Sequence, residues 1–259
     1  MVQKSAIYSK ECGKAFTFAG TFAIIFMEFQ RVNTKERAMV NILFDCPNIS
    51  DFKSELAPYI SANSRVTVVA FSFYDDYVYD NESWQRVYGE GIGEGYFEVV
   101  DEFAAFGVAK ENITYINYFT DTKDNARKKI ENADIIYFTG GLPDRMMDRI
   151  IEFELVDALK NFDGVVVGYS AGAVIQLKEY HLYPDGDYDD FGYYDGLGYI
   201  DSIYLEVHYE YKNEQNESIR RALNERNLPL YVTHTRGGGI ISENGKIRIV
   251  GKVDLYKNQ

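Results

Sequence analysis

The chain has few of the residues that build disulfide scaffolds and metal centres. Its 259 residues include two cysteines, three histidines, five prolines and one tryptophan. Cys12 and Cys46 lie far apart in the sequence and lack the spacing of metal ligands, so we expect neither a disulfide framework nor a zinc site. Such sparing use of cysteine is typical of a reducing compartment, and we expect a cytoplasmic protein.

Positive charge is also scarce. The chain has 27 lysines and arginines against 40 aspartates and glutamates, which gives a formal net charge of -13. A protein that binds phosphate backbones needs a cluster of lysine and arginine, and no cluster of useful size is present. We therefore expect no nucleic-acid partner, and the negative charge serves solubility.

The N-terminal segment differs in composition from the rest of the chain. Residues 15–29 form a mostly apolar run that is too short to span a bilayer comfortably, although lysines precede it as in a signal peptide. Acidic residues interrupt this pattern, and no small-residue cleavage site follows it. We interpret residues 1–38 as an N-terminal extension of unclear role and expect no membrane attachment.

From residue 39 onward, apolar runs of strand length alternate with helical patterns. This alternation predicts a single α/β domain over residues 39–259, with a doubly wound, mostly parallel sheet and helices on both faces. An Asn-Gly turn between two C-terminal strands predicts a final hairpin, and we expect a long loop at residues 72–94. The predicted strands are 40–44, 66–71, 113–118, 135–138, 165–168, 230–235, 239–242 and 247–250, and the predicted helices are 51–60, 97–106, 123–131, 143–160 and 217–227.

The most informative motif is Gly-Tyr-Ser-Ala-Gly-Ala at residues 168–173. It follows a buried strand and precedes a helical segment. Glycines on both sides of a serine at such a junction form a nucleophile elbow, which exposes the serine hydroxyl. The motif predicts a serine hydrolase with Ser170 as its nucleophile.

A serine hydroxyl needs a base to take its proton and an acid to orient that base. Position favours His208, at the end of a predicted strand, over His234 and then His181. Acidic residues crowd the segment after residue 184, and most of them belong to a solvated loop. We expect one carboxylate to face the histidine. The candidates are Asp185, Asp187, Asp189, Asp190 and Asp195 in this loop and Glu179 before it.

These features resemble the serine peptidases of the peptidase E and cyanophycinase type, which share the class I glutamine amidotransferase-like fold. The resemblance rests on residues 168–173, on Thr-Gly-Gly at residues 139–141 after a strand, and on a histidine a few tens of residues after the serine. It covers most of residues 39–258. It implies that Ser170 is the nucleophile and that His208 is the general base.

The same resemblance suggests the acid and the mechanism. In the dipeptidase branch the acid follows the serine by about fifteen residues, an interval that Asp185 fits best, with Asp187 and Glu179 left open. The backbone amides of Gly141 and Ala171 would form the oxyanion hole. The implied reaction is dipeptidase-like hydrolysis of a small peptide by acyl transfer, with no metal or organic cofactor.

One departure from the family concerns substrate recognition. The aspartyl dipeptidases place an arginine shortly after the histidine, whereas this chain carries Asn216 at the best-matching position. Arg220 and Arg221 follow a helical turn later, and Arg236 is a further candidate for binding a carboxylate. Specificity for Asp-X peptides is therefore in doubt.

Three other functions are compatible with parts of this sequence. A glutamine amidotransferase of this fold would need cysteine in place of Ser170. An α/β-hydrolase esterase would use Ser170 with Asp201 and His234, at closer spacing than is usual for that class. A binding or regulatory protein would keep the fold without turnover. The sequence leaves the oligomeric state open, a homodimer included.

Overall fold

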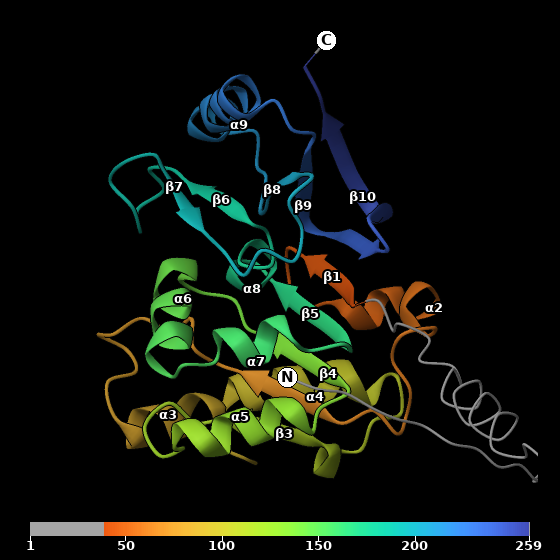
Figure 1. Ribbon diagram of the computed structural model, residues 1–259, viewed down its shortest axis with the longest axis vertical. Helices are drawn as coiled ribbons and strands as arrows, with labels where there is room; N and C mark the ends of the chain where they lie inside the picture. The colour runs from red at the N-terminus through yellow and green to blue at the C-terminus, as the bar shows by residue number, and fades with distance from the viewer. Residues whose placement is uncertain (1–38, 259) are drawn as a thin grey trace, which may run out of the picture. The chain divides into compact units, whose positions relative to one another are not determined.

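An eight-stranded sheet forms the centre of the computed structural model, which describes residues 39–258 (Figure 1). Its order is β10-β9-β1-β5-β4-β2-β3, with β8 beside β9, and the strands from β3 to β1 are parallel neighbours. The strands are β1 (Val40–Phe44), β2 (Val66–Val69), β3 (Ile113–Ile116), β4 (Ile135–Phe138), β5 (Val165–Tyr169), β8 (Tyr204–Glu206), β9 (Leu230–Glu243) and β10 (Lys246–Tyr256).

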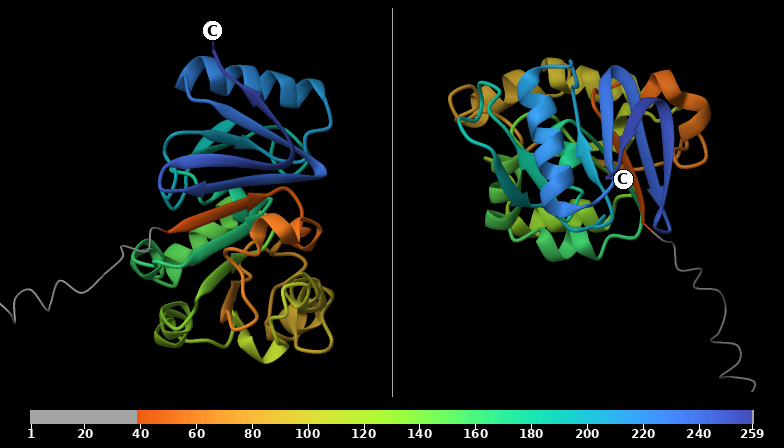
Figure 2. Two further views of the ribbon diagram at one scale, coloured as in Figure 1. Left: turned by 90° about the vertical axis from the view of Figure 1, so that its right-hand side faces the viewer. Right: turned by 90° about the horizontal axis from the view of Figure 1, so that it is seen from above.

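Helices cover both faces of this sheet because alternate side chains of each strand point to opposite faces. In β1, Ile42 and Phe44 pack into one apolar cluster and Leu43 into the other. The left view of Figure 2 shows the two helical layers on opposite sides of the strands. This confirms the predicted α/β architecture. The first layer holds α2 (Lys53–Leu56), α3 (Asn81–Tyr88) and α4 (Glu94–Ala104), and the second holds α5 (Lys123–Glu131), α6 (Pro143–Glu152), α7 (Val156–Lys160) and α8 (Ala171–Val174).

Two predicted elements were wrong. The segment expected to be a long loop, residues 72–94, contains α3, whose first turn is closed by a capping box between Asp80 and Ser83. The single helix expected over residues 143–160 is two helices, because the chain between them takes a left-handed conformation at Glu154 (φ 56°). None of the helices within residues 39–258 has the length and apolar character needed to cross a bilayer.

The predicted C-terminal hairpin is confirmed. Strands β9 and β10 are joined by Asn244 and Gly245, both with positive φ, as a two-residue hairpin turn requires. The hairpin extends the sheet because β9 pairs antiparallel with β1. Helix α9 (Asn213–Arg226) packs over β8 and β9, and a separate two-stranded sheet is formed by β6 (Glu179–Leu182) and β7 (Gly192–Asp195).

A buried arginine on α6 fixes the chain that follows β2. Only 6% of the Arg149 side chain is exposed; its guanidinium donates to the carbonyls of Phe71 and Phe73, pairs with Asp75 at 2.6 Å, and lies 3.6 Å from the Phe73 ring centroid. Ser72, held between these two carbonyls, accepts a hydrogen bond from the Leu142 N–H at 2.7 Å. Arg149 thereby fixes the position of the Ser72 carbonyl, which binds the chain directly after the Gly140–Gly141 turn.

Replacing this arginine is expected to destabilise the fold. Arg149→Met leaves buried carbonyls unpaired, so we expect the free energy of unfolding to fall by about 2–4 kcal/mol. Arg145 is the matched control, since it also pairs with Asp75 from α6 but has a side chain 50% exposed. Arg145→Met should cost no more than about 0.5 kcal/mol in urea unfolding. Equal losses for the two variants would contradict this account.

Candidate active site

The chain makes a strained turn at Ser170, between β5 and α8. Ser170 has φ 51° and ψ -118°, a conformation that costs a residue with a side chain about 1–3 kcal/mol. Glycines make the turn sterically feasible: a Cβ on Gly168 would lie 2.0 Å from the Gly172 carbonyl oxygen, and one on Gly172 would lie 2.3 Å from that of Phe138. The turn therefore has the geometry of a nucleophile elbow.

The elbow is anchored to both neighbouring strands. The Ser170 N–H donates to the Phe44 carbonyl at the end of β1, at 3.0 Å, and the Gly172 N–H donates to the Thr139 carbonyl after β4, at 3.1 Å. Parallel strands bring their carboxyl ends to the same edge of a sheet, where α/β proteins place their sites. Ser170 is half-buried at this edge.

One pocket of about 470 Å³ brings together the residues that the sequence analysis selected. Ser170, His208, Asp185, Gly141 and Ala171 all line it. They come from four separate places along the chain and meet because the sheet edge, the loop after β6 and the loop after β8 converge there. Their individual roles stay predictions.

His208 lies in the loop after β8, with its backbone in the left-handed region at φ 54°. The loop is held by Gln215, which is buried in α9: its amide nitrogen donates to the His208 carbonyl at 2.9 Å, and its amide oxygen accepts from the Glu210 N–H. Burial lowers the pKa of His208 below its ordinary value, while Asp45, Glu206 and Glu210 act in the opposite direction. A neutral imidazole at this place is able to accept a proton.

The backbone amides of Gly141 and Ala171 are the expected donors of the oxyanion hole. Gly141 has φ 135°, and a Cβ there would lie 2.2 Å from the Ser72 carbonyl oxygen, so only glycine fits. Ala171 is the first residue of α8, directly after the serine. Within residues 39–258, neither amide donates to a backbone carbonyl. Both are thus available to a substrate oxygen.

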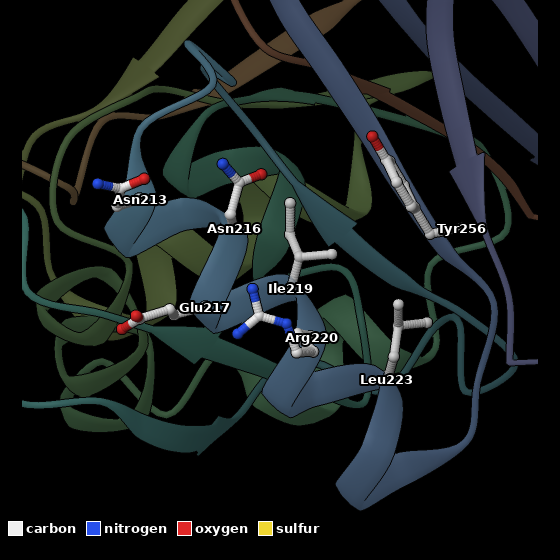
Figure 3. Close-up of a pocket in the computed structure, with 7 residues that line it drawn as sticks. All are labelled: Asn213, Asn216, Glu217, Ile219, Arg220, Leu223 and Tyr256. Carbon is white, nitrogen blue, oxygen red and sulfur yellow. The ribbon is translucent and has the colours of Figure 1, made fainter.

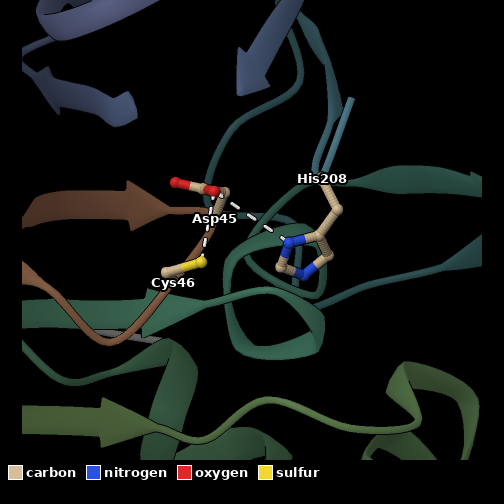
Figure 4. A group of neighbouring side chains, drawn as sticks. All are labelled: Asp45, Cys46 and His208. Atoms are coloured by element: carbon tan, nitrogen blue, oxygen red, sulfur yellow. Dashed lines mark hydrogen bonds and ion pairs between the residues drawn. The ribbon is translucent and has the colours of Figure 1, made fainter. Parts of the chain in front are cut away.

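A carboxylate that the sequence analysis did not select lies beside the histidine. Asp45 follows β1 and is completely buried, and its Oδ2 is 4.0 Å from the His208 Nδ1 (Figure 4). The same oxygen accepts hydrogen bonds from the Arg236 N–H at 2.9 Å and the Cys46 thiol at 3.3 Å. Its signal in the sequence is its position, immediately after the first predicted strand.

Asp45, Cys46 and His208 are residue types that bind transition metals, and their donor atoms lie within 4.8 Å of one another. Burial raises the pKa of the Cys46 thiol to about 11, with a further contribution from the Asp45 charge. The protonated thiol donates a hydrogen bond to the Asp45 carboxylate, and His208 lies beside that carboxylate at a distance longer than a hydrogen bond.

The acids selected from the sequence have other partners. Asp185 and Asp187 line the pocket, but the Asp185 Oδ1 accepts the backbone N–H groups of Asp187 and Tyr188, at 3.0 and 3.2 Å. Asp187 accepts from the Tyr74 hydroxyl at 2.7 Å. Glu179 pairs with Arg226 at 2.6 Å, which lowers the pKa of its carboxyl.

The other two histidines are paired with carboxylates of their own. The His181 Nε2 lies 3.0 Å from the Glu206 Oε2, and both side chains are buried. The His234 Nε2 lies 2.9 Å from the Asp254 Oδ2, and His234 does not line the Ser170 pocket. The structure thus does not bring together the serine and histidine that the esterase hypothesis requires.

None of the arginines considered for substrate recognition lines the Ser170 pocket. Asn216 and Arg220 face a different pocket, between α9 and β10 (Figure 3). The Arg221 guanidinium pairs with Glu225 on its own helix. That of Arg236 pairs with Asp51, with its side chain 64% exposed.

Comparison with known proteins supports the α/β fold and the family resemblance that the sequence predicted. The fold is similar to that of a Listeria monocytogenes EGD-e protein described as a peptidase E, with TM-score 0.58 and 13% identity over 83% of this chain and 98% of that one. It is also similar to a peptidase from an acI-B1 actinobacterium, with TM-score 0.57 and 14% identity over 85% and 90% of the two chains. No curated protein sequence matches. Residues 94–250, more than half of the chain, match the family model of peptidase family S51, so the chain belongs to this peptidase family, as the resemblance to peptidase E predicted.

Proposed function

We propose that this family member is a serine peptidase that hydrolyses small peptides by acyl transfer to Ser170. The observation that carries the proposal is the strained elbow at Ser170, which opens into the same pocket as an imidazole and two available backbone amides. Strain of this kind persists only where the surrounding structure holds it in place, and it gathers at functional sites.

The residues divide the chemistry among them. The Ser170 oxygen attacks the scissile carbonyl carbon while the His208 Nε2 takes the hydroxyl proton. The carbonyl oxygen becomes an oxyanion, stabilised by the Gly141 and Ala171 amides. The C–N bond then breaks, and the imidazolium gives its proton to the leaving amine. A water molecule then attacks the acyl carbonyl while His208 takes its proton. The bond to the Ser170 oxygen breaks, His208 returns the proton to that oxygen, and the carboxylic acid product is released.

The charge of the pocket supports a substrate class. Its lining includes four carboxylates, of Asp185, Asp187, Glu206 and Glu210. Within the part of the chain that the structure describes, Lys212 is its one lysine and no arginine lines it. Lys212 is paired with Glu210 at 2.8 Å. An acidic side chain would meet uncompensated negative charge there, so we propose that the enzyme favours peptides that carry positive charge beside the scissile bond.

A fluorophosphonate probe tests the nucleophile. The probe should label the wild-type protein, because it phosphonylates serines that a neighbouring base activates. Labelling should disappear in Ser170→Ala and persist in Ser54→Ala, which alters an exposed serine on α2. Both variants should keep the wild-type circular dichroism spectrum. Absence of labelling in folded wild-type protein would instead support the non-catalytic binding or regulatory function.

Adding one methyl group tests the oxyanion hole. In Gly141→Ala the new Cβ clashes with the Ser72 carbonyl and displaces the amide, so we expect kcat to fall on the order of 10²–10³-fold. Gly91→Ala is the control, since Gly91 also has a positive φ (69°) but has open space around it. It should keep a wild-type rate. Wild-type turnover by Gly141→Ala would exclude this amide from the reaction.

A dipeptide library tests the substrate class. We expect kcat/KM to be at least about 10-fold higher for peptides with lysine or arginine beside the scissile bond than for their aspartate counterparts, a difference of about 1.4 kcal/mol. Asp187→Asn should narrow that preference, while Asp124→Asn, on the exposed face of α5, should not. Hydrolysis confined to Asp-X peptides would contradict the proposed charge selectivity.

A further inference from the structure

Among residues 39–258, no lysine or arginine side chain forms an ion pair with the buried carboxylate of Asp45. The guanidinium of Arg236, whose backbone N–H it accepts, pairs instead with Asp51. The second carboxylate oxygen, Oδ1, is fully buried and has no hydrogen-bond partner among the described residues. Keeping an unpaired charge out of water is costly, and a buried polar group without a partner calls for an explanation.

We propose that Asp45 is the carboxylate that orients His208 for catalysis, in place of Asp185. The assignment rests on the proposed serine peptidase function and deepens it. In a serine triad, a buried carboxylate accepts the Nδ1–H of the histidine, which directs Nε2 at the serine and stabilises the imidazolium that forms. Asp45 offers its Oδ2 on the Nδ1 side of the His208 ring.

The 4.0 Å separation between these atoms is longer than a hydrogen bond. Catalytic hydrogen bonds are often long before substrate binds and shorten in the complex. The imidazole is 43% exposed, so the ring has room to turn toward the carboxylate. The carboxylate stays in place, since its Oδ2 is held by the Arg236 N–H and the Cys46 thiol, as Figure 4 shows for the thiol.

Three residues around Asp45 have strained backbone conformations, and each of them positions a group that a catalytic triad requires. Ser170, His208 and Arg236 have φ values of 51°, 54° and 56°, in a region that residues with a Cβ seldom occupy. They respectively place the nucleophile, the imidazole and the amide that holds the Asp45 carboxylate. Strain shared by these residues is the pattern expected when a fold positions catalytic groups at a cost in stability.

Asp185 lacks the surroundings of an orienting acid. Its Oδ1 closes a turn of the exposed loop by accepting two backbone N–H groups, and its side chain is exposed to solvent. Water screens an exposed charge, so it stabilises a nearby imidazolium much less than a buried charge does. Asp45 is completely buried and sits directly after the strand that anchors the Ser170 turn.

The electrostatics of His208 give the proposal a distinct signature. Burial lowers the pKa of His208, whereas the charges of Asp45, Glu206 and Glu210 raise it. Cys46 is neutral and adds no charge at pH 7 because the pKa of its thiol is raised. Removing the Asp45 charge therefore lowers the pKa of His208 further, and the acid limb of the reaction moves to lower pH.

The test compares three variants by their rates of fluorophosphonate labelling as a function of pH. Asp45→Asn should lower the plateau rate at least about 100-fold, because an amide favours the wrong tautomer, and should move the acid limb to lower pH. Glu210→Gln, which removes an exposed charge that acts on the same imidazole, should move the limb in the same direction and lower the plateau rate far less than Asp45→Asn does. Asp185→Asn should also lower the plateau rate far less than Asp45→Asn does.

A plateau rate for Asp45→Asn within about threefold of wild type, or a large loss confined to Asp185→Asn, would overturn the assignment. If the wild-type protein is labelled and Ser170→Ala is not, the peptidase proposal stands whichever acid orients His208. If Ser170→Ala is labelled as fast as wild type, the peptidase proposal itself is wrong. Thermal unfolding of each variant shows whether a lost rate reflects a lost fold.

A measurement on the unmodified protein covers the case in which Asp45→Asn does not fold. Nitrogen-15 NMR distinguishes the two neutral tautomers of imidazole, and the His208 signals are assigned by their absence in His208→Gln. With only three histidines the spectrum is simple. We expect the proton on Nδ1, facing Asp45, with Nε2 unprotonated toward Ser170. A proton held on Nε2 at neutral pH would overturn the proposal.

Discussion

The close approach of β5 and α8 to β4 is the constraint on which the site depends. It leaves no room for side chains at Gly168 and Gly172, and the serine between them is forced into a left-handed conformation. The same packing lets the Ser170 N–H reach the Phe44 carbonyl at the end of β1. The position of the serine in the pocket is therefore tied to the end of β1. Asp45, the next residue after Phe44, is held at the same place.

Much of the fold follows from local sequence. Apolar runs of four or five residues, alternating with helical patterns, are sufficient to predict a doubly wound sheet, and the Asn-Gly pair specifies the C-terminal hairpin. The errors lie where a short polar signal outweighs composition. Helix α3 begins at a capping box formed by Asp80 and Ser83 inside a tyrosine-rich, acidic stretch that resembles a loop. The break at Glu154 depends on a single backbone torsion that residue type does not reveal.

The site was only partly predictable, for a related reason. The elbow is recognisable in the sequence because it requires glycines at fixed spacing around Ser170. His208 is a clear candidate because the chain has few histidines. The carboxylate next to the imidazole has no such signature. Asp45 lies 163 residues before His208, and the two meet because β9 pairs with β1, which Asp45 follows, and with β8, which precedes the His208 loop. The interval of about fifteen residues after the serine, which the resemblance to peptidase E implied, favoured Asp185; this residue shares the pocket but is bound to its own loop.

The pocket brings together the Ser170 elbow, the His208 imidazole and the Gly141 and Ala171 amides. Among residues 39–258, its lining includes four carboxylates and no arginine. A crystal structure of the fluorophosphonate adduct tests the central claim most directly. The account predicts a phosphonyl group on the Ser170 oxygen, with one phosphonyl oxygen within hydrogen-bond distance of both the Gly141 and Ala171 amides. An adduct on another residue, or an oxygen that faces away from both amides, would contradict it.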